Sequence, residues 1–191
     1  YSNVRTLNVI DECDVATILI DVSKGFDNQD KNIIRYIIDK GKGLLVIVNK
    51  WDLVENKETN TMKMIMDDME YSLPNIKYYP IKFISIKNNF KIGEVLKQVL
   101  QIHKRRKTKI PTSKLNIFLQ NIIRYYPPPS TRGKEIKINY ITQIHHSPPR
   151  FAFFANYPDY ISETYKRYLE NRIREDFNFE GIPIKISIRK K

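Results

Sequence analysis

Three polar residues follow an apolar stretch at a place where their types and spacing could bind a purine base. The run LLVIV is followed at once by Asn49, Lys50, Trp51 and Asp52. A carboxylate can accept two parallel hydrogen bonds, and guanine offers such a pair from its ring N–H and its 2-amino group. Adenine lacks both donors and would leave the carboxylate unpaired, and a site of this kind rejects the wrong analogue by roughly 10⁴–10⁵-fold. We therefore predict that Asp52 selects guanine, that the stem of Lys50 lies over the purine, and that Asn49 braces the base and neighbouring loops.

The second half of the chain carries nearly all of its net positive charge. The chain has 33 Lys and Arg against 21 Asp and Glu, a net charge of +12. Residues 1–104 hold 15 basic and 14 acidic residues, whereas residues 105–191 hold 18 and 7. A general lysine bias would raise both halves, so the asymmetry favours contact with a polyanion such as RNA over a merely solvated basic surface. The candidate RNA-contacting residues lie in a connector and in the tail: Arg105, Arg106, Lys107, Lys109, Arg189, Lys190 and Lys191.

The elements that must position the purine-binding residues alternate between strand-like and helix-like patterns. Such alternation predicts right-handed crossovers and a parallel sheet, and ligands of these sheets bind outside the carboxyl ends of the strands. The apolar strands lack polar alternation, which predicts helices on both sheet faces. The predicted strands are residues 15–22, 44–49 and 79–85, and the predicted helices are residues 28–42, 58–73 and 92–106.

The pattern changes after a charged connector that ends in proline. A helix, two strands, a helix and a strand are predicted there, with Ser162 capping the second helix. These are residues 112–126, 136–144, 150–156, 160–177 and 182–190. We therefore predict an α/β domain at residues 1–104, a linker at 105–111 and a small α+β domain at 112–191.

Other chemistries find little support in the sequence. Adjacent residues of a strand point to opposite faces, so His145 and His146 do not suit one metal ion, and His103 lies far away in the chain. The single cysteine, Cys13, excludes an internal disulfide and is expected to pack rather than react. We predict no metal site.

The sequence favours a cytoplasmic location without a membrane partner. No segment reaches the roughly 18 consecutive apolar residues of a transmembrane helix. The first residues lack the basic-then-apolar layout of a signal peptide. A lone cysteine is typical of proteins from a reducing compartment.

Aromatic residues in the second half offer stacking surfaces for RNA bases. Phe151 and Phe153 share one strand face and are expected in the core. The other candidates are Tyr125, Tyr126 and Phe154.

Several segments resemble one family of GTPases. Asn49, Lys50 and Asp52 match the N-K-x-D guanine-specificity motif of P-loop GTPases, and Ser85-Ile86-Lys87 is similar to their second base-binding motif, S-A-K. The segment DVSKGFDNQD resembles the D-A-x-x-G-[IF]-x-x-Q-D segment of the tandem GTPases known as EngA or Der. The opening YSNVRTLNVIDECD resembles the helix after the second switch of that family's second G domain. The segments PPP, KINYITQ, SPPRFAFFAN and IPI of the second half resemble its terminal KH-like domain.

The resemblance implies a partial P-loop GTPase-type parallel sheet followed by a KH-like αββαβ domain. It assigns guanine-nucleotide binding to Asn49, Lys50, Asp52, Ser85 and Ile86, with the backbone N–H of Ile86 reaching guanine O6. The implied cofactor is GTP or GDP. The implied function is that of a GTPase in ribosome biogenesis. Its partners would be the large ribosomal subunit with its rRNA and the protein's own N-terminal G domain.

Several parts of the family pattern are missing from the 191 residues. They contain neither the phosphate-binding loop G-x-x-x-x-G-K-[ST] nor the D-x-x-G switch, and the chain opens on Tyr1 rather than Met. We therefore expect a fragment that is inactive by itself and holds no catalytic residue, with Mg²⁺ bound only when an N-terminal part is present. The G-x-x-G loop of RNA-gripping KH domains is also missing from residues 105–191. The alternative interpretation is a stand-alone, non-catalytic RNA- or ribosome-binding module.

Overall fold

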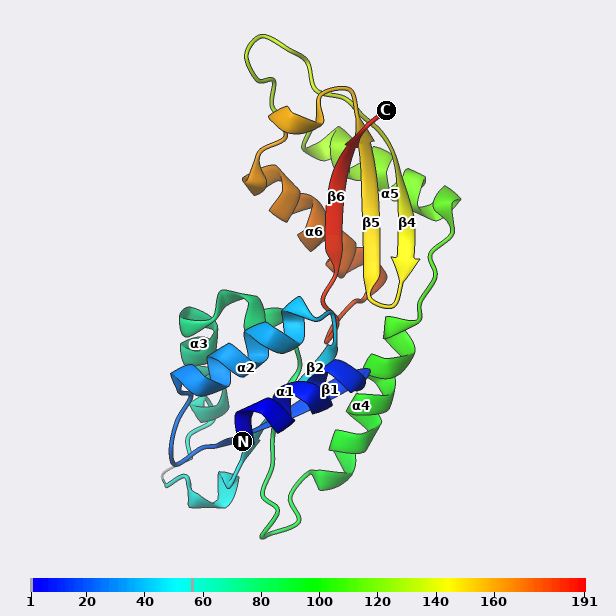
Figure 1. Ribbon diagram of the computed structural model, residues 1–191. Coiled ribbons are helices and arrows are strands. Elements are labelled where there is room, and N and C mark those ends of the chain that lie inside the picture. The colour runs from blue at the N-terminus through cyan, green and yellow to red at the C-terminus, as the bar shows by residue number, and fades with distance from the viewer. Residues whose placement is uncertain (1, 56) are drawn as a thin grey trace. The chain divides into compact units, whose positions relative to one another are not determined.

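The chain forms two compact units in a computed structural model that describes residues 2–55 and 57–191 (Figure 1). The first unit runs up to Arg105 and also includes Glu180–Pro183. The second comprises Arg106–Phe179 and Ile184–Lys191. The predicted fold class, α/β followed by α+β, is confirmed.

The first unit is built on a three-stranded parallel sheet in the order β1-β2-β3. In the register of β1 and β2, Asp21 lies beside Asn49, so both strands end at the same edge. The strands are β1 (Val15–Asp21), β2 (Gly43–Asn49) and β3 (Ile81–Phe83). The helices are α1 (Ser2–Glu12), α2 (Asn28–Asp39), α3 (Thr61–Ser72) and α4 (Ile92–Arg106), with 3₁₀ turns η1 (Trp51–Leu53) and η2 (Pro74–Tyr78).

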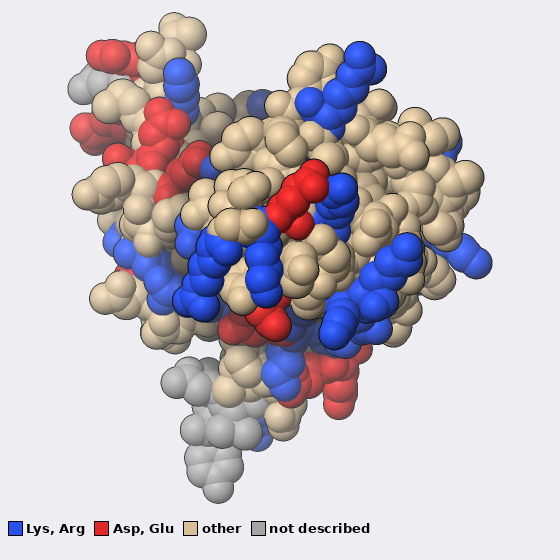
Figure 2. Space-filling view, turned by 90° about the horizontal axis from the view of Figure 1, so that it is seen from above, with Lys and Arg blue, Asp and Glu red and all other residues tan. Residues whose placement is uncertain are grey.

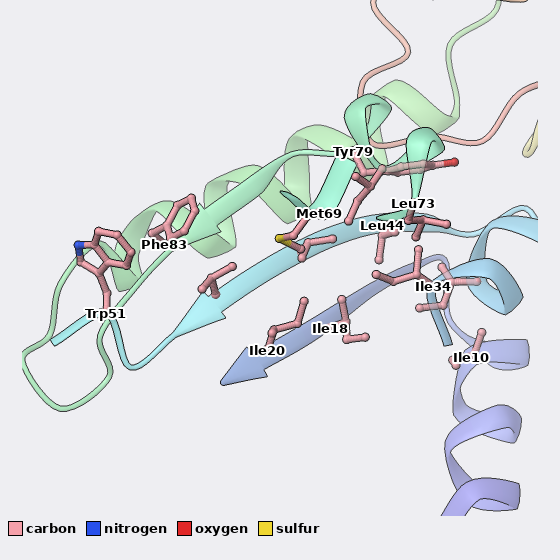
Figure 3. Packing of buried hydrophobic residues seen from close by; sticks show 14 residues of the cluster. Ile10, Ile18, Ile20, Ile34, Leu44, Trp51, Met69, Leu73, Tyr79 and Phe83 are labelled. Atoms are coloured by element: carbon pink, nitrogen blue, oxygen red, sulfur yellow. The ribbon is translucent and has the colours of Figure 1, made fainter. Parts of the chain in front are cut away.

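Apolar side chains from one face of this sheet pack against α2 and α3 (Figure 3). Helix α2 begins with a capping box, in which the side chains of Asp27 and Asp30 each accept from the other's backbone N–H. Its apolar face buries Ile34 and Ile37. On the other sheet face, a Cβ added at Gly43 would meet Ile102 of α4 at 2.7 Å. Every residue from Gly43 to Val48 is buried, as the apolar pattern of this strand predicted.

Two details of the first unit differ from the sequence prediction. Strand β3 covers only Ile81–Phe83 of the predicted 79–85. At its start Tyr79 N still donates to Ile76 O of the preceding 3₁₀ turn, and after its end Ser85 pairs with Phe90. The prediction that helices cover both faces is wrong for β1, where Thr17 and Leu19 are exposed. They line an open hollow of about 780 Å³ between α1 and β1, because these two elements do not close over this edge.

The second unit is a three-stranded mixed sheet with two helices on one face (Figure 1). Strand β5 is central, antiparallel to β4 and parallel to β6. Phe151 and Phe153 are fully buried, and Ser162 Oγ accepts from Tyr165 N at 3.2 Å, as predicted for a core pair and a helix cap. The elements are α5 (Thr112–Tyr125), β4 (Ile138–His146), β5 (Pro149–Ala155), η3 (Pro158–Tyr160), α6 (Glu163–Phe177) and β6 (Lys185–Lys190).

Candidate nucleotide site and basic surface

The carboxyl ends of the three parallel strands are tied together by backbone hydrogen bonds. Val22 N donates to Asn49 O at 3.1 Å, and Trp51 N donates to Ile84 O at 3.0 Å. Trp51 is buried and packs edge-on against Phe83, with ring centroids 4.9 Å apart (Figure 3). This aromatic pair anchors the turn after β2, so the polar side chains around it project from a rigid edge.

Asp52 and Ser85, which come from different strand ends, are in direct contact. Ser85 Oγ donates to Asp52 Oδ1 at 2.5 Å and accepts from Asn88 N at 3.1 Å. Ser85 is only 2% exposed, so its hydroxyl is fixed by the fold. The hydrogen bond from Ser85 lowers the pKa of Asp52 below its usual 3.8. The carboxylate is therefore charged at neutral pH and keeps acceptor sites for two further donors.

Asn49 connects the loop that follows β2 with the loop that follows β3. Its Oδ1 accepts from Ile86 N at 3.3 Å, a long contact for this type of bond. Ile86 N–H, the donor expected to reach guanine O6, therefore faces the Asn49 amide. The structure thus brings all five predicted nucleotide-binding residues to one edge of the sheet.

Asp21 belongs to this cluster and was missed as a site residue. Lys50 Nζ lies 2.6 Å from Asp21 Oδ2, while Asp21 Oδ1 accepts from Ser23 N at 3.0 Å and Ser23 Oγ at 2.7 Å. The Lys50 ammonium, followed by the Ser23 hydroxyl, lowers the pKa of Asp21 to about 2. The sequence held a signal for it, since Asp21 also follows an apolar run that ends at the same edge.

The basic connector residues differ in how far they reach solvent. Arg105 Nη1 pairs with Glu180 Oε2 at 2.7 Å. Arg106 is 5% exposed, and its Nε donates to Ser147 Oγ at 2.7 Å. Both guanidinium groups are thus engaged within the protein. Lys107 and Lys109 are exposed.

The tail and the connector lie at opposite ends of the second unit's sheet. Ile110 N donates to Gln143 Oε1 and Arg106 contacts Ser147, which places the connector near the β4–β5 turn. Lys190, the last residue of β6, pairs with Ala155 at the other end of β5. Along β6, the backbone of Lys190 lies roughly 17 Å from that of Lys185.

The tail lies beside a loop that carries Arg132, Lys134 and Lys137, which were not predicted as RNA contacts. Asn156 follows β5 and connects this strand to the loop, because Lys137 N donates to Asn156 Oδ1 at 2.8 Å. Lys134 Nζ sits 4.7 Å from the ring centroid of Tyr157 and the Arg132 guanidinium 5.7 Å from that of Tyr160. Figure 2 looks onto this end, where Lys and Arg side chains gather with few acidic ones among them.

Metal binding and membrane insertion gain no support from the described part of the chain. Residues 2–55 and 57–191 contain no group of three or more His, Cys, Asp and Glu placed to hold a metal ion. No helix within these residues is long and apolar enough to cross a membrane.

Two protein families match this chain, and together they define the class of protein to which it belongs. Residues 3–105, more than half of the chain, match the family described as the elongation factor Tu GTP binding domain. Residues 109–189 match the family described as the KH-domain-like of EngA bacterial GTPase enzymes, C-terminal. The class is thus a GTP-binding domain followed by a KH-domain-like unit, in agreement with the parallel sheet and the α+β unit.

Whole-chain relatives narrow the class to one family. A protein named GTPase Der from Chlorobium phaeobacteroides is 44% identical over 191 residues, which are 100% of this chain and 44% of that protein. GTPase Der from Phocaeicola vulgatus is 44% identical over 192 residues, with the same coverage of both chains. The chain belongs to the EngA/Der family of GTPases. It spans less than half the length of the curated relatives that it matches.

A crystal structure of Aquifex aeolicus Era aligns with 97% of this chain and 67% of its own, at 18% identity and a TM-score of 0.43.

Proposed function

We propose that the protein to which this chain belongs binds GTP and GDP and hydrolyses GTP. We assign guanine recognition to Asn49, Lys50, Asp52, Ser85 and Ile86. The observation that carries the proposal is the charged Asp52 carboxylate, held by the buried Ser85 hydroxyl at the joined strand ends. Membership of a GTPase family supports it.

In this site each side chain has a distinct task. Asp52 accepts the paired N–H donors of guanine, and the stem of Lys50 covers one face of the purine. The backbone N–H of Ile86, weakly held by Asn49, is free to turn to guanine O6. Asp21 holds the ammonium of Lys50 so that its methylene stem is positioned over the base.

Phosphoryl transfer needs a phosphate cradle and Mg²⁺, and the 191 residues contain no sequence that fits either role. We therefore assign hydrolysis and Mg²⁺ binding to the full-length protein. The 191-residue chain by itself is inactive and binds GTP weakly.

The guanine-reading role of Asp52 is tested in the full-length protein with its other nucleotide site inactivated. Asp52→Asn replaces an acceptor by a donor, so we expect weaker GTP binding and a preference for xanthosine nucleotides, whose 2-oxo group accepts where guanine donates. Nucleotide affinities measured by titration calorimetry check this. The matched control is Asp159→Asn, an exposed aspartate of the second unit. Unchanged guanine affinity in Asp52→Asn would refute the assignment.

We also propose that the protein acts in the cytoplasm in assembly of the large ribosomal subunit, and that its second unit contacts rRNA. The net charge of the second half supports this, as does the match to the KH-domain-like family of EngA enzymes. Lys107, Lys109 and the tail residues Arg189, Lys190 and Lys191 are the proposed phosphate contacts.

Cosedimentation with large ribosomal subunits tests this second part. Replacing Arg189, Lys190 and Lys191 together by Ser should weaken binding and reduce the slope of log affinity against log salt by roughly 2–3, because each lost phosphate contact removes roughly 0.7–0.9. An unchanged slope would mean that the tail is a solvated surface. Partitioning that is equal with a GTP analogue and with GDP would exclude a model in which the bound nucleotide switches ribosome binding on and off.

A further inference from the structure

The second unit has one sheet face that its own helices leave uncovered. Figure 1 shows helices α5 and α6 on one face of this sheet. Phe151 and Phe153 are fully buried, and we place these two large apolar side chains on the face that the helices cover. Side chains alternate along a strand, so the residues between these two positions and beyond them point to the opposite face. The strand registers arrange that face as three rows: Tyr140, Phe154 and Arg189; Thr142, Ala152 and Ser187; His145, Arg150 and Lys185.

The first row is a stacked aromatic pair next to an arginine. The rings of Tyr140 and Phe154 lie 4.3 Å apart with an interplanar angle of 11°. Tyr140 is nevertheless 37% exposed, so a second planar group has ring surface to stack on. Arg189 lies beside Phe154 in the register and is exposed.

The second row consists of small side chains, and the third row is basic. Thr142, Ala152 and Ser187 are short, so they do not rise between the aromatic row and the basic row. Arg150 and Lys185 are paired in the register of β5 and β6, and both are exposed. No carboxylate occupies any of the nine described positions on this face.

We propose that this uncovered face binds single-stranded RNA. Bases stack on Tyr140 and Phe154, and phosphates contact Arg150, Arg189 and Lys185. Aromatic rings can stack only with bases that are not already paired and stacked in a duplex, which makes the ligand single-stranded. The inference rests on the RNA contact proposed above and adds its site and the form of the RNA.

The chemistry of the face favours RNA over an acidic protein segment. A peptide carboxylate would use the arginines but would leave the stacked rings without a matching group, whereas a nucleotide supplies both a phosphate and a flat base. Stacking tolerates every base, so we expect little sequence preference.

The stacking half of the proposal is tested with the 191-residue chain and a fluorescent single-stranded RNA of mixed sequence. Tyr140→Leu should weaken binding about 5- to 160-fold, the range for loss of one stacked base. Tyr140→Phe keeps the ring and should bind within about twofold of wild type. Tyr71→Leu is the matched control, because Tyr71 is 91% exposed on α3 of the first unit. Circular dichroism confirms that each variant is folded.

The phosphate half is tested by salt dependence. Arg150→Gln should lower the slope of log affinity against log salt by roughly 0.7, the value for one contact to a single strand, and Tyr140→Leu should leave the slope unchanged. A duplex of the same sequence should bind more weakly than the single strand.

The outcomes separate this inference from the proposed function. If Tyr140→Leu binds like Tyr71→Leu, or if the duplex binds as tightly as the single strand, the sheet-face site is overturned. If replacing Arg189, Lys190 and Lys191 by Ser still weakens binding in that case, the proposed RNA contact of the second unit stands without the sheet-face site. A chain that binds no RNA at all overturns both.

Discussion

Lys50 is constrained both through its backbone and through its side chain. Its φ of 64° lies in the left-handed region, which is uncommon for a residue other than glycine, asparagine or aspartate. Its ammonium is held by Asp21 on the neighbouring strand. Strained residues of this kind persist where the surrounding structure determines them, and they cluster at functional sites. At this position the constraint points the side chain across the strand ends.

The pKa of Asp21 reports whether this ion pair forms in solution. In the wild type, NMR titration of the carboxyl group should give a pKa of about 2, and Lys50→Met should raise it toward 3.8. The folded pKa lies below the unfolded value, so the pair stabilises the fold above about pH 4. That contribution is lost as the pH falls from about 4 to about 2. Lys24→Met, which removes a nearby exposed lysine, should leave the pKa where it is. A pKa that stays near 2 in Lys50→Met would assign the effect to Ser23 alone.

One side chain of helix α5 pairs with the backbone of the edge strand β4. Asn116 Oδ1 accepts from Ile141 N at 3.1 Å, and its Nδ2 donates to Ile141 O at 3.2 Å. The amide therefore occupies the place that another strand would take. Ile141 is fully buried, so water is a poor substitute for these bonds.

Asn116→Ala should destabilise this part of the second unit by about 2–3 kcal/mol, because it leaves a buried backbone N–H and C=O unpaired. Hydrogen exchange at the Ile141 amide measures the effect directly. Asn121→Ala, a change at an exposed position of the same helix, should alter exchange by less than about 0.5 kcal/mol. Equal protection of Ile141 in both variants would contradict the edge-pairing role.

At the scale of the whole chain, four residues near the C-terminus belong to the first unit. Gly181 N donates to Tyr78 O at 2.8 Å, and its carbonyl accepts from Leu44 N at 2.9 Å. Gly181 has a φ of 80°, and an added Cβ would lie 2.7 Å from Ile102 Cγ1. The N-terminal unit therefore contains a contact that only the late part of the chain can supply.

Gly181→Ala should consequently destabilise the first unit, although it lies far from that unit in sequence. We expect a loss of about 2–4 kcal/mol, about 1 from the left-handed backbone and the rest from overpacking. The amide of Leu44 should exchange faster, while the amides of β5 should not change.

Gly133→Ala is the matched control for this prediction. Gly133 also has a positive φ, of 71°, but nothing lies within 4 Å of an added Cβ, so only the backbone term of about 1 kcal/mol applies. If Gly181→Ala instead loosens β5, or changes exchange no more than Gly133→Ala does, the assignment of this segment is wrong.

The sequence by itself determined those features that depend on neighbours along the chain. The alternation of apolar runs with amphipathic segments predicted the parallel sheet and the α+β unit, because helix and strand periodicity are local. Ser162 was predicted as a helix cap, and Phe151 with Phe153 as core, for the same reason. The order of Asn49, Lys50 and Asp52 after an apolar run indicated a site at the end of a strand.

Tertiary structure decided which distant residues meet. The pairing of Asp21 with Lys50 depends on the register of two parallel strands, and the contact of Ser85 with Asp52 depends on the position of a third. The sequence likewise did not show that Arg106 is buried against Ser147, that Glu180–Pro183 belongs to the first unit, or that Tyr140 stacks on Phe154 beside Arg189. Local periodicity states which face of an element is apolar, but the partner of each polar side chain is set by how strands pair and where loops end, and these are properties of the folded chain as a whole.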